Sequence, residues 1–457
     1  MSATQALDTI REPSTTPEFL LRRINYERTT TVPYQSPDFK LDRMRRLLGL
    51  LGDPHLGLKA IHIAGTKGKG STAAMVAQIL QSAGYRTGLY TSPHLDRIEE
   101  RIQIDGQLCP AGQFQALANQ VEPAVEKLDA EAAADGANGP TFFEVTTAMA
   151  FLHFAQANVA AAVLEVGLGG RLDSTNVCQP EVCIITSISF DHTRQLGNTL
   201  AAIAGEKAGI IKPHIPVVSG VLDPEPKDVI TARAHELNAP LIQRGVDYDF
   251  SIPQSPQTFD YHQPGSELQG LQLSLLGAHQ AANAVAAVAA IHVLRNRGWS
   301  ITDDAIRQGL ASTRCVARIE QISTAPAIIL DVAHNLASIE ALLHVLRERF
   351  SPARSILIFA SSKDKDYCGM LGLLLPAFDT IFLTNYINNP RAMPAESLLA
   401  IAQEMRAKQT DRNYHPILHA TTRPQDALRL ARAIATPHDL ICITGSFFLA
   451  AELRPLL

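Results

Sequence analysis

The stretch IHIAGTKGKGS, residues 61–71, contains the residues that most clearly indicate a chemical function. An apolar strand pattern runs into three glycines and then into a helix that begins near Thr72. Glycines let a backbone turn its amides inward around a phosphate, and a helix N-terminus favours negative charge. Lys69 could reach the terminal phosphates, and Ser71 could face a magnesium ion. The stretch predicts a nucleotide phosphate site formed by Gly65, Thr66, Gly68, Lys69, Gly70, Ser71 and Thr72.

The spacing of these glycines departs from the strict GxxxxGK[ST] phosphate loop. Gly65 lies only three positions before Gly68, and Gly70 separates Lys69 from Ser71. A glycine-rich turn alone is weak evidence, because any tight connection from a strand to a helix uses glycines. Two lysines and a serine in the same turn favour a phosphate site over a plain connection.

Glu165 and His192 each follow an apolar run that has the length of a buried strand. Glu165 ends AAAVLE, before the flexible GLGG, and His192 comes soon after CIITSI. In an α/β protein such positions meet at the carboxyl edge of the sheet, where ligands bind. Each has a structural alternative, because Glu165 could pair with Arg171 and His192 could cap a helix or lie in the core. Beside a phosphate site, they favour a magnesium site.

The C-terminal half has a similar polar group after an apolar run. Asp331, His334 and Asn335 follow AIIL and precede the helical pattern SIEALL. Asn335 is equally well explained as the N-cap of that helix. A later charged run, SSKDKDY at 361–367, could face the same cleft, but a solvated loop of mixed charge is slightly preferred.

Short apolar runs alternate with helical patterns along most of the chain. This alternation predicts an α/β protein with mostly parallel sheets and crossover helices. The chain has 457 residues, 46% hydrophobic and 19% charged, which is more than one core usually holds. The pattern restarts after an Ala-rich helix, so the domain boundary should fall between Gly298 and Arg318. We expect a flexible segment at 1–18, a first domain at 19–300 and a second at 301–457.

The bulk composition excludes several classes of protein. A formal charge of −5 argues against nucleic acid as the main partner, because phosphate neutralisation needs a basic face. The six cysteines form no CxxC pair and do not alternate with His at zinc-ligand spacing, and we interpret them as reduced thiols. The N-terminal residues have charges where a signal peptide would be apolar, and no later stretch has the length of a membrane span. We therefore expect a cytoplasmic protein that acts on small molecules.

Motifs spread from residue 65 to residue 455 resemble those of the folylpolyglutamate synthase/dihydrofolate synthase family of the Mur ligase superfamily. Besides the phosphate loop, the matching segments are TSPHL (91–95), TFFE (141–144), LEVGLGGRLDSTN (164–176), SFDHT (189–193), GEKAGIIKP (205–213), LDVAHN (330–335) and GSFFLAAELRP (445–455). Two departures stand out. Lys67 stands where many members have Asn, and CVARIE (315–320) replaces a Pro-Gly-Arg run, although Arg318 is retained.

The resemblance implies a fold, a reaction and a set of cofactors. The fold would be an N-terminal P-loop ATPase domain of the Mur ligase type, with a smaller Rossmann-like domain that carries glutamate ligation. ATP would activate a folate-type carboxylate as an acyl phosphate, and L-glutamate would then displace the phosphate. Members often act as monomers with two Mg²⁺ ions and, in some cases, a monovalent cation.

The resemblance also implies roles for individual residues. Ser71 or Ser92 with Glu165 would hold one Mg²⁺, and His192 would help to hold a second. Lys207 corresponds to a lysine that carries a carbamate and so becomes an anion that can approach magnesium. Lys69, His192 and Lys207 would act in catalysis. Nucleotide binding would also use residues beyond the phosphate loop, namely Asn283, Arg318, Asp331 and His334, the last of which could instead lie near the incoming glutamate.

The flat pterin end of a folate would bind among apolar side chains. Phe142 and Phe143 are aromatic and could stack on it, although a pair of phenylalanines heading a helix more often belongs to the core. The resemblance places the pteroate pocket at these two residues and Leu172.

Two alternative functions are left open. The first is another Mur-type amino-acid ligase, such as one acting on a cell-wall nucleotide. Such ligases usually place a separate domain before the phosphate loop, whereas Gly65 here follows only 64 residues. The second is a non-catalytic nucleotide-binding homologue. This alternative is disfavoured because the chain retains Lys69, Glu165, His192, Lys207 and Asp331. Whether the acceptor is dihydropteroate, a reduced folate or both is left undecided.

Overall fold

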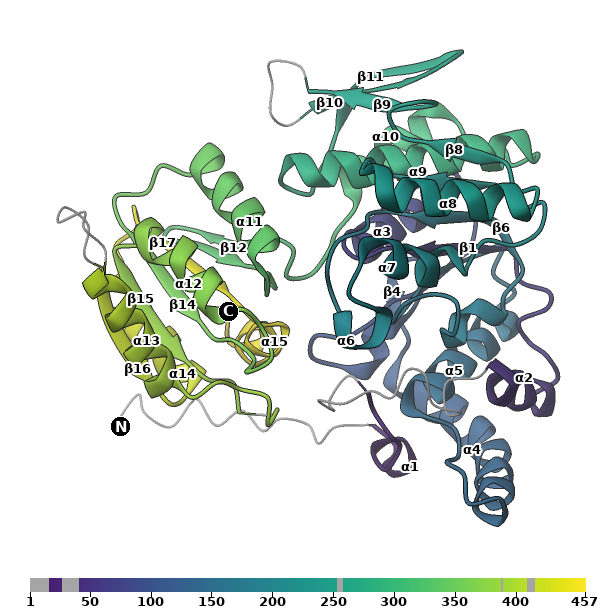
Figure 1. Cartoon of the computed structure of the whole chain (residues 1–457), viewed down its shortest axis with the longest axis horizontal. Helices are drawn as coiled ribbons and strands as arrows, with labels where there is room; N and C mark the ends of the chain where they lie inside the picture. Colours follow the sequence, from purple (N-terminus) through teal and green to yellow (C-terminus); the bar gives the residue numbers. More distant parts are fainter. Residues whose placement is uncertain (1–15, 27–40, 253–257, 388, 409–415) are drawn as a thin grey trace.

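The computed structural model describes residues 16–26, 41–252, 258–387, 389–408 and 416–457. Within these ranges the chain forms two α/β lobes that lie side by side (Figure 1). The segment 1–18, expected to be flexible, falls almost entirely outside the described residues, and its last residue begins the short helix α1 (Glu18–Leu21). None of the described helices has the length and apolar character needed to cross a membrane.

The N-terminal lobe is built on an eight-stranded sheet that is parallel except at one edge. β2 runs antiparallel to β3, and β3 to β4, while every other neighbouring pair is parallel. The expected mostly parallel sheet is confirmed. In order across the sheet, its strands are β4 (Gln107–Leu108), β3 (Ile102–Ile104), β2 (Thr87–Tyr90), β5 (Ala161–Glu165), β1 (Ala60–Ala64), β6 (Pro180–Ile185), β7 (Val217–Ser219) and β8 (Leu241–Gln243).

Helices cover both faces of this sheet, because its central strands are apolar on both sides. Ile61 and Ile63 of β1 pack with α3, α9 and α10, whereas Ala60 and Ala64 face the helices of the opposite side. Strands buried on both faces appear as continuous apolar runs, so the sequence pattern predicts them well. The helices of this lobe after α1 are α2 (Leu41–Leu50), α3 (Lys69–Ser82), α4 (Ala111–Ala134), α5 (Phe142–Gln156), α6 (Thr193–Leu196), α7 (Leu200–Ala208), α8 (Pro224–Glu236), α9 (Ala278–Asn296) and α10 (Asp303–Ser312), with 3₁₀ turns at Ile98–Arg101 and Ser174–Val177.

A small antiparallel sheet lies beside the lobe, formed by β9 (Asp249–Ser251), β10 (Thr258–Gln263) and β11 (Ser266–Gln272). Phe259 and Tyr261 of β10 join the cluster that contains α9. The small sheet is therefore part of the same core.

Helix α10 belongs to the N-terminal lobe by its packing. Ile306 lies in the same hydrophobic cluster as Ile79 of α3. Gly309 approaches α3 so closely that an added Cβ would lie 2.6 Å from the Cα of Ile79. The first domain was expected to end at residue 300, but α10 lies beyond that point. We propose that the connection between the lobes runs over residues 313–319.

The C-terminal lobe contains a six-stranded sheet in which only the edge strand β12 is antiparallel to its neighbour. The apolar runs AIIL, SILIF, TIFLT and LICIT of the sequence predict four of these strands, which are confirmed, whereas the strand at 417–421 and the helix at 367–374 were not predicted. In order across the sheet, the strands are β12 (Glu320–Thr324), β13 (Ala327–Leu330), β17 (Leu440–Thr444), β14 (Ser355–Phe359), β15 (Thr380–Thr384) and β16 (Ile417–Thr421). The helices are α11 (Leu336–Arg349), α12 (Tyr367–Leu374), α13 (Ala395–Lys408), α14 (Pro424–Ile434) and α15 (Phe447–Leu453), and 3₁₀ turns lie at Leu375–Ala377 and Arg454–Leu456.

Candidate active site

A cavity of about 2130 Å³ lies between the two lobes. Its walls include residues that follow β1, β5 and β6 of the first sheet and β13, β14 and β17 of the second. Parallel strands bring their carboxyl ends to one edge of a sheet, so each sheet presents its loops to the same space. Ordinary ligand pockets measure about 300–1,000 Å³, so this cavity has room for more than one substrate.

The turn from β1 into α3, the predicted phosphate loop, has a backbone conformation that depends on its glycines. Gly65 and Gly68 have φ values of 149° and 82°, which side chains rarely allow. A Cβ on Gly68 would lie 2.1 Å from Oδ1 of Asn283, and a Cβ on Gly65 would lie 1.9 Å from Oγ1 of Thr186. Both glycines are therefore required by the shape of the turn and by the side chains that pack on it.

Residues after β6 hold this turn in place. The Thr66 amide donates to the Ser187 carbonyl at 2.7 Å. The Lys67 carbonyl accepts from Oγ1 of Thr186 at 2.6 Å and from Oγ of Ser187 at 3.0 Å. Sequence reasoning missed both hydroxyl residues, because their only signal is their position directly after an apolar strand.

Glu165 lies against the phosphate loop. Its Oε2 accepts from the Ser92 amide at 3.2 Å and would lie 3.4 Å from a Cβ on Gly70. Burial raises the pKa of Glu165, while Lys69 and the Ser92 amide oppose this shift. The alternative of a pair with Arg171 is wrong, because Arg171 instead bonds Glu206 at 2.8 Å.

Lys207 of α7 is buried beneath the same loop. Its Nζ donates to the Gly65 carbonyl at 2.9 Å. Burial lowers the pKa of Lys207 to about 7, with a further contribution from Lys69. From its sequence alone this lysine looks like an ordinary residue on a helix surface, and only the fold places it in the interior.

His192 lies at the N-terminal end of the short helix α6, in the left-handed conformation with φ 48°. Burial lowers its pKa, and Lys69 and Lys207 are close enough to contribute to this shift. The neighbouring Asp191 accepts from the His192 amide at 2.9 Å and lies 3.6 Å from Nζ of Lys365. Burial opposes ionisation of Asp191, but His192 and Lys365 together hold its pKa well below the usual range.

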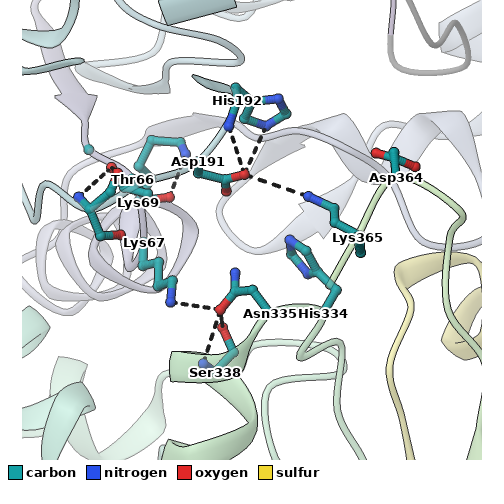
Figure 2. Close-up of polar contacts among 12 residues, drawn as sticks. Thr66, Lys67, Lys69, Asp191, His192, His334, Asn335, Ser338, Asp364 and Lys365 are labelled. Atoms are coloured by element: carbon teal, nitrogen blue, oxygen red, sulfur yellow. Dashed lines mark hydrogen bonds and ion pairs between the residues drawn. The ribbon is translucent and has the colours of Figure 1, made fainter. Parts of the chain in front are cut away.

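The contact with Lys365 changes the interpretation of the run 361–367. Lys365 is only 20% exposed and lines the cavity together with Ser362 and Asp364. The interpretation of this run as a solvated loop is wrong, because it lies at the carboxyl end of β14, opposite Asp191 (Figure 2).

Asp331 organises the C-terminal wall of the cavity through backbone contacts. Its Oδ2 accepts from the Ile319 amide at 2.8 Å, and its Oδ1 accepts from the Ala333 amide at 2.7 Å. These bonds hold the turn that carries Arg318, which lines the cavity with Asn283. Burial raises the pKa of Asp331, and the amides and Arg318 oppose this shift.

His334 has a defined tautomer. Its Nδ1 lies 2.8 Å from the Val332 carbonyl oxygen, which can only accept, so Nδ1 carries the proton and donates it. Burial lowers the pKa of His334 to about 4. Near pH 7 the ring is therefore neutral, and Nε2 has a lone pair available to accept a proton.

Phe142, Phe143 and Leu172 all line the cavity. Phe142 is 5% exposed, and Arg101 lies over its ring at 5.2 Å, so it belongs largely to the core. Phe143 is less buried and packs near Gly167, where an added Cβ would lie 2.6 Å from the ring. Of the two aromatic side chains, Phe143 is the better placed to contact a flat ligand.

Sequence reasoning overlooked the role of Asp173 in shaping the same wall. Its Oδ2 accepts from the amides of Gly167 and Leu168, both at 3.0 Å, and the Asp173 side chain lines the cavity. The carboxylate thereby fixes the glycine-rich loop that follows Glu165. An Asp three residues after the end of a glycine run was the available signal.

Comparison with protein families matches residues 63–291 to the Mur ligase middle domain and residues 317–447 to the Mur ligase glutamate ligase domain. The dihydrofolate synthase/folylpolyglutamate synthase of Bacillus subtilis is 36% identical over 419 residues, which cover 91% of this chain and 94% of that protein. The folylpolyglutamate synthase of Lacticaseibacillus casei is 36% identical over 441 residues, covering 94% and 98%.

Comparison with solved structures agrees with these sequence matches. A Mycobacterium tuberculosis folylpolyglutamate synthase complexed with ADP has a TM-score of 0.84 at 34% identity, with 96% of each chain covered. Escherichia coli FolC in complex with DHPP and ADP has a TM-score of 0.81 at 30% identity, covering 97% of this chain and 98% of that one.

Proposed function

The chain belongs to the folylpolyglutamate synthase/dihydrofolate synthase family of Mur ligases, and we propose that it uses ATP to join L-glutamate to a folate-type carboxylate. The observation that carries this proposal is the cavity shared by the two lobes. It brings the phosphate loop and Glu165 of one lobe to face Asp331 and His334 of the other.

In the first step, an oxygen of the acceptor carboxylate attacks the γ-phosphorus, the bond to ADP breaks, and an acyl phosphate forms. Lys69, at the start of α3, would neutralise the phosphate oxygens, and the amino end of that helix would favour the same negative charge. Positioning and electrostatic stabilisation are sufficient for this step, so no covalent enzyme intermediate is required.

In the second step, the α-amine of glutamate attacks the acyl carbon and phosphate leaves. Glutamate arrives with a protonated amine, so a base must take a proton before or during attack. His334 lines the cavity with Nδ1 bonded to a carbonyl, and we assign its Nε2 this role. With a pKa of about 4 the ring is a weak base in the empty cavity, and the negative charge of bound phosphates would raise that pKa. Closure of the lobes would exclude water from the acyl phosphate.

The proposed magnesium ligands form a suitable donor set. Glu165, Ser71 and Ser92 offer oxygens at one side of the loop, and His192 lies nearby. In the described parts of the chain, no three His, Cys, Asp or Glu side chains form a metal cluster. A site completed by phosphate oxygens and water is typical of Mg²⁺, which would neutralise charge on the γ-phosphate during its transfer.

Lys207 is proposed to carry a carbamate. A neutral lysine amine adds CO₂ at Nζ and releases a proton, and burial lowers the pKa of Lys207 to about 7. The fraction of neutral amine, and with it the carbamate, should therefore rise with pH through this value. We expect ¹³C-bicarbonate to give a carbamate carbon resonance in the wild type that is absent in Lys207→Arg. A resonance unchanged in the variant would contradict the assignment.

Five further expectations about cofactors, assembly, location and acceptor are predictions. They comprise the second Mg²⁺, a monovalent cation, the monomeric state, the cytoplasmic location and the choice between dihydropteroate and a reduced folate as acceptor.

The proposed function is tested by measuring phosphate release with MgATP and glutamate. One assay contains 7,8-dihydropteroate and the other tetrahydrofolate, and products are identified by mass. Turnover with both establishes two activities, and turnover with one identifies the single function. No turnover with either acceptor would favour a different Mur-type ligase or a non-catalytic homologue.

A further inference from the structure

A lysine of the phosphate loop reaches across the cavity to the other lobe. Nζ of Lys67 donates to Oδ1 of Asn335 at 2.8 Å, although the two residues are 268 positions apart (Figure 2). Lys67 stands where the family resemblance leads one to expect Asn, and neither proposed step uses its side chain. A role for the Lys67 ammonium group can be inferred from its surroundings.

The fold of the loop does not depend on the Lys67 side chain. The Lys67 main chain makes the structural contacts, since its amide donates to Oγ of Ser187 at 3.1 Å and its carbonyl accepts from Thr186 and Ser187. Any residue other than proline could provide these bonds. The ammonium group is therefore available to act at a distance from the loop.

Its partner is next to the proposed base. Asn335 is the N-cap of α11, and its Oδ1 also accepts from the amide and the hydroxyl of Ser338, at 3.1 and 2.8 Å. His334 is the adjacent residue and lies between Asn335 and Lys365 in the view of Figure 2. A restraint on Asn335 thus restrains His334 relative to the phosphate loop.

The charges around Lys67 determine when its contact with Asn335 is most favourable. The amino end of α11 and the amino end of α3 both lie at this place, and each disfavours a cation. Burial lowers the pKa of Lys67, and Lys365 acts in the same direction, whereas Asp191 and Glu340 oppose them. A triphosphate or acyl phosphate on the loop would offset this unfavourable field, so the contact should be strongest when the first substrate is bound.

We propose that Lys67 is a positioning residue that, through Asn335, holds His334 over the phosphate loop for the attack of glutamate. This proposal rests on the proposed function and adds a residue to its second step. Loss of Lys67 should slow the reaction with glutamate and leave acyl phosphate formation nearly intact.

The test separates the two steps in the full-length protein. Acyl phosphate formation is followed without glutamate by positional isotope exchange in ¹⁸O-labelled ATP, and the second step by kcat/KM for glutamate. For Lys67→Met we expect little change in isotope exchange and a loss of about tenfold in kcat/KM, as for a hydrogen bond to a charged group. Lys67→Arg should recover part of the loss. Lys127→Met, on the exposed side of α4, is the matched control.

A double-mutant cycle shows whether the effect passes through Asn335. Asn335→Ser keeps a residue that caps helices well but shortens the side chain that Lys67 reaches. If the contact carries the effect, the double variant should lose little more than the worse single variant.

Three results would overturn the proposal: losses that multiply in the double variant, an equal fall in isotope exchange, or an unchanged kcat/KM for glutamate. The second would make Lys67 a direct phosphate ligand. Ligation by the wild type is measured first, since its absence would count against the proposed function, whereas differences among active variants bear on Lys67 alone.

Discussion

Two turns with positive φ angles face the cavity, and they are built in opposite ways. The turn after β1 uses Gly65 and Gly68, at 149° and 82°. The turn before β12 uses Ala317 and Ile319, at 53° and 51°, on either side of Arg318. L-residues pay roughly 1–2 kcal/mol for the left-handed conformation, and glycine does not.

The second turn is held by one local bond and by two bonds to residues 12 and 15 positions further along the chain. The Ala317 amide donates to Oε2 of Glu320 at 2.8 Å, the Ile319 amide to Oδ2 of Asp331 at 2.8 Å, and the Val332 amide to the Ala317 carbonyl at 3.1 Å. Its conformation is imposed by the tertiary structure. The first turn is specified by residue type, which is why only the first one can be recognised in the sequence.

The largest expected effect comes from removing the cation of the glycine turn. Lys69→Ala should lower kcat for ligation by about 100- to 1,000-fold, because the charge transferred with the γ-phosphate loses its nearest fixed cation. Phosphate release measures the loss, and an unchanged melting temperature shows that the fold is intact. An unaffected rate would refute the phosphate-loop assignment.

A methyl group on the glycine turn should be nearly as harmful. In Gly68→Ala the new Cβ would lie 2.1 Å from Oδ1 of Asn283 at a φ of 82°, so the turn must shift. We expect weaker MgATP binding by calorimetry and a loss of roughly 1–2 kcal/mol in unfolding free energy. Gly112→Ala, where a Cβ meets nothing within 4 Å, is the control. Equal behaviour of the two variants would show that the glycine is not needed.

The turn at 317–319 should instead be destabilised when its hydrogen bonds to Asp331 are removed. Asp331→Asn leaves one acceptor oxygen for the two amides of Ile319 and Ala333, so one buried amide loses its partner. Denaturant unfolding should show a loss of about 1–3 kcal/mol, and nucleotide affinity should fall because Arg318 is less well held. If stability is unchanged, the turn is not held by Asp331.

The smallest effect should have the opposite sign. Ala317→Gly removes the strain of the left-handed backbone, which costs roughly 1–2 kcal/mol. Glycine also loses about 0.5–1 kcal/mol more conformational entropy on folding, so the free energy of unfolding should rise by about 0.5 kcal/mol. Urea denaturation with unchanged m-value checks this gain. A clear loss would mean that the buried methyl group of Ala317 contributes more than the strain costs.

The sequence predicted most of the buried strands, a phosphate loop and the polar residues at strand ends, because each depends on local patterns. It did not predict that Lys207 is buried or that Lys365 faces Asp191. Both depend on how elements distant in the chain come together. The proposed site residues line one cavity, and their individual roles stay predictions until they are tested.

The sequence by itself determined which segments become buried strands and where glycine permits a phosphate loop, because apolar periodicity and residue type act within a few residues. Only the tertiary structure decided which side chains share the cavity, how burial lowers the pKa values of Lys207 and His334, and how Ala317 and Ile319 are held left-handed. Those properties arise from desolvation and from hydrogen bonds between residues far apart in the chain.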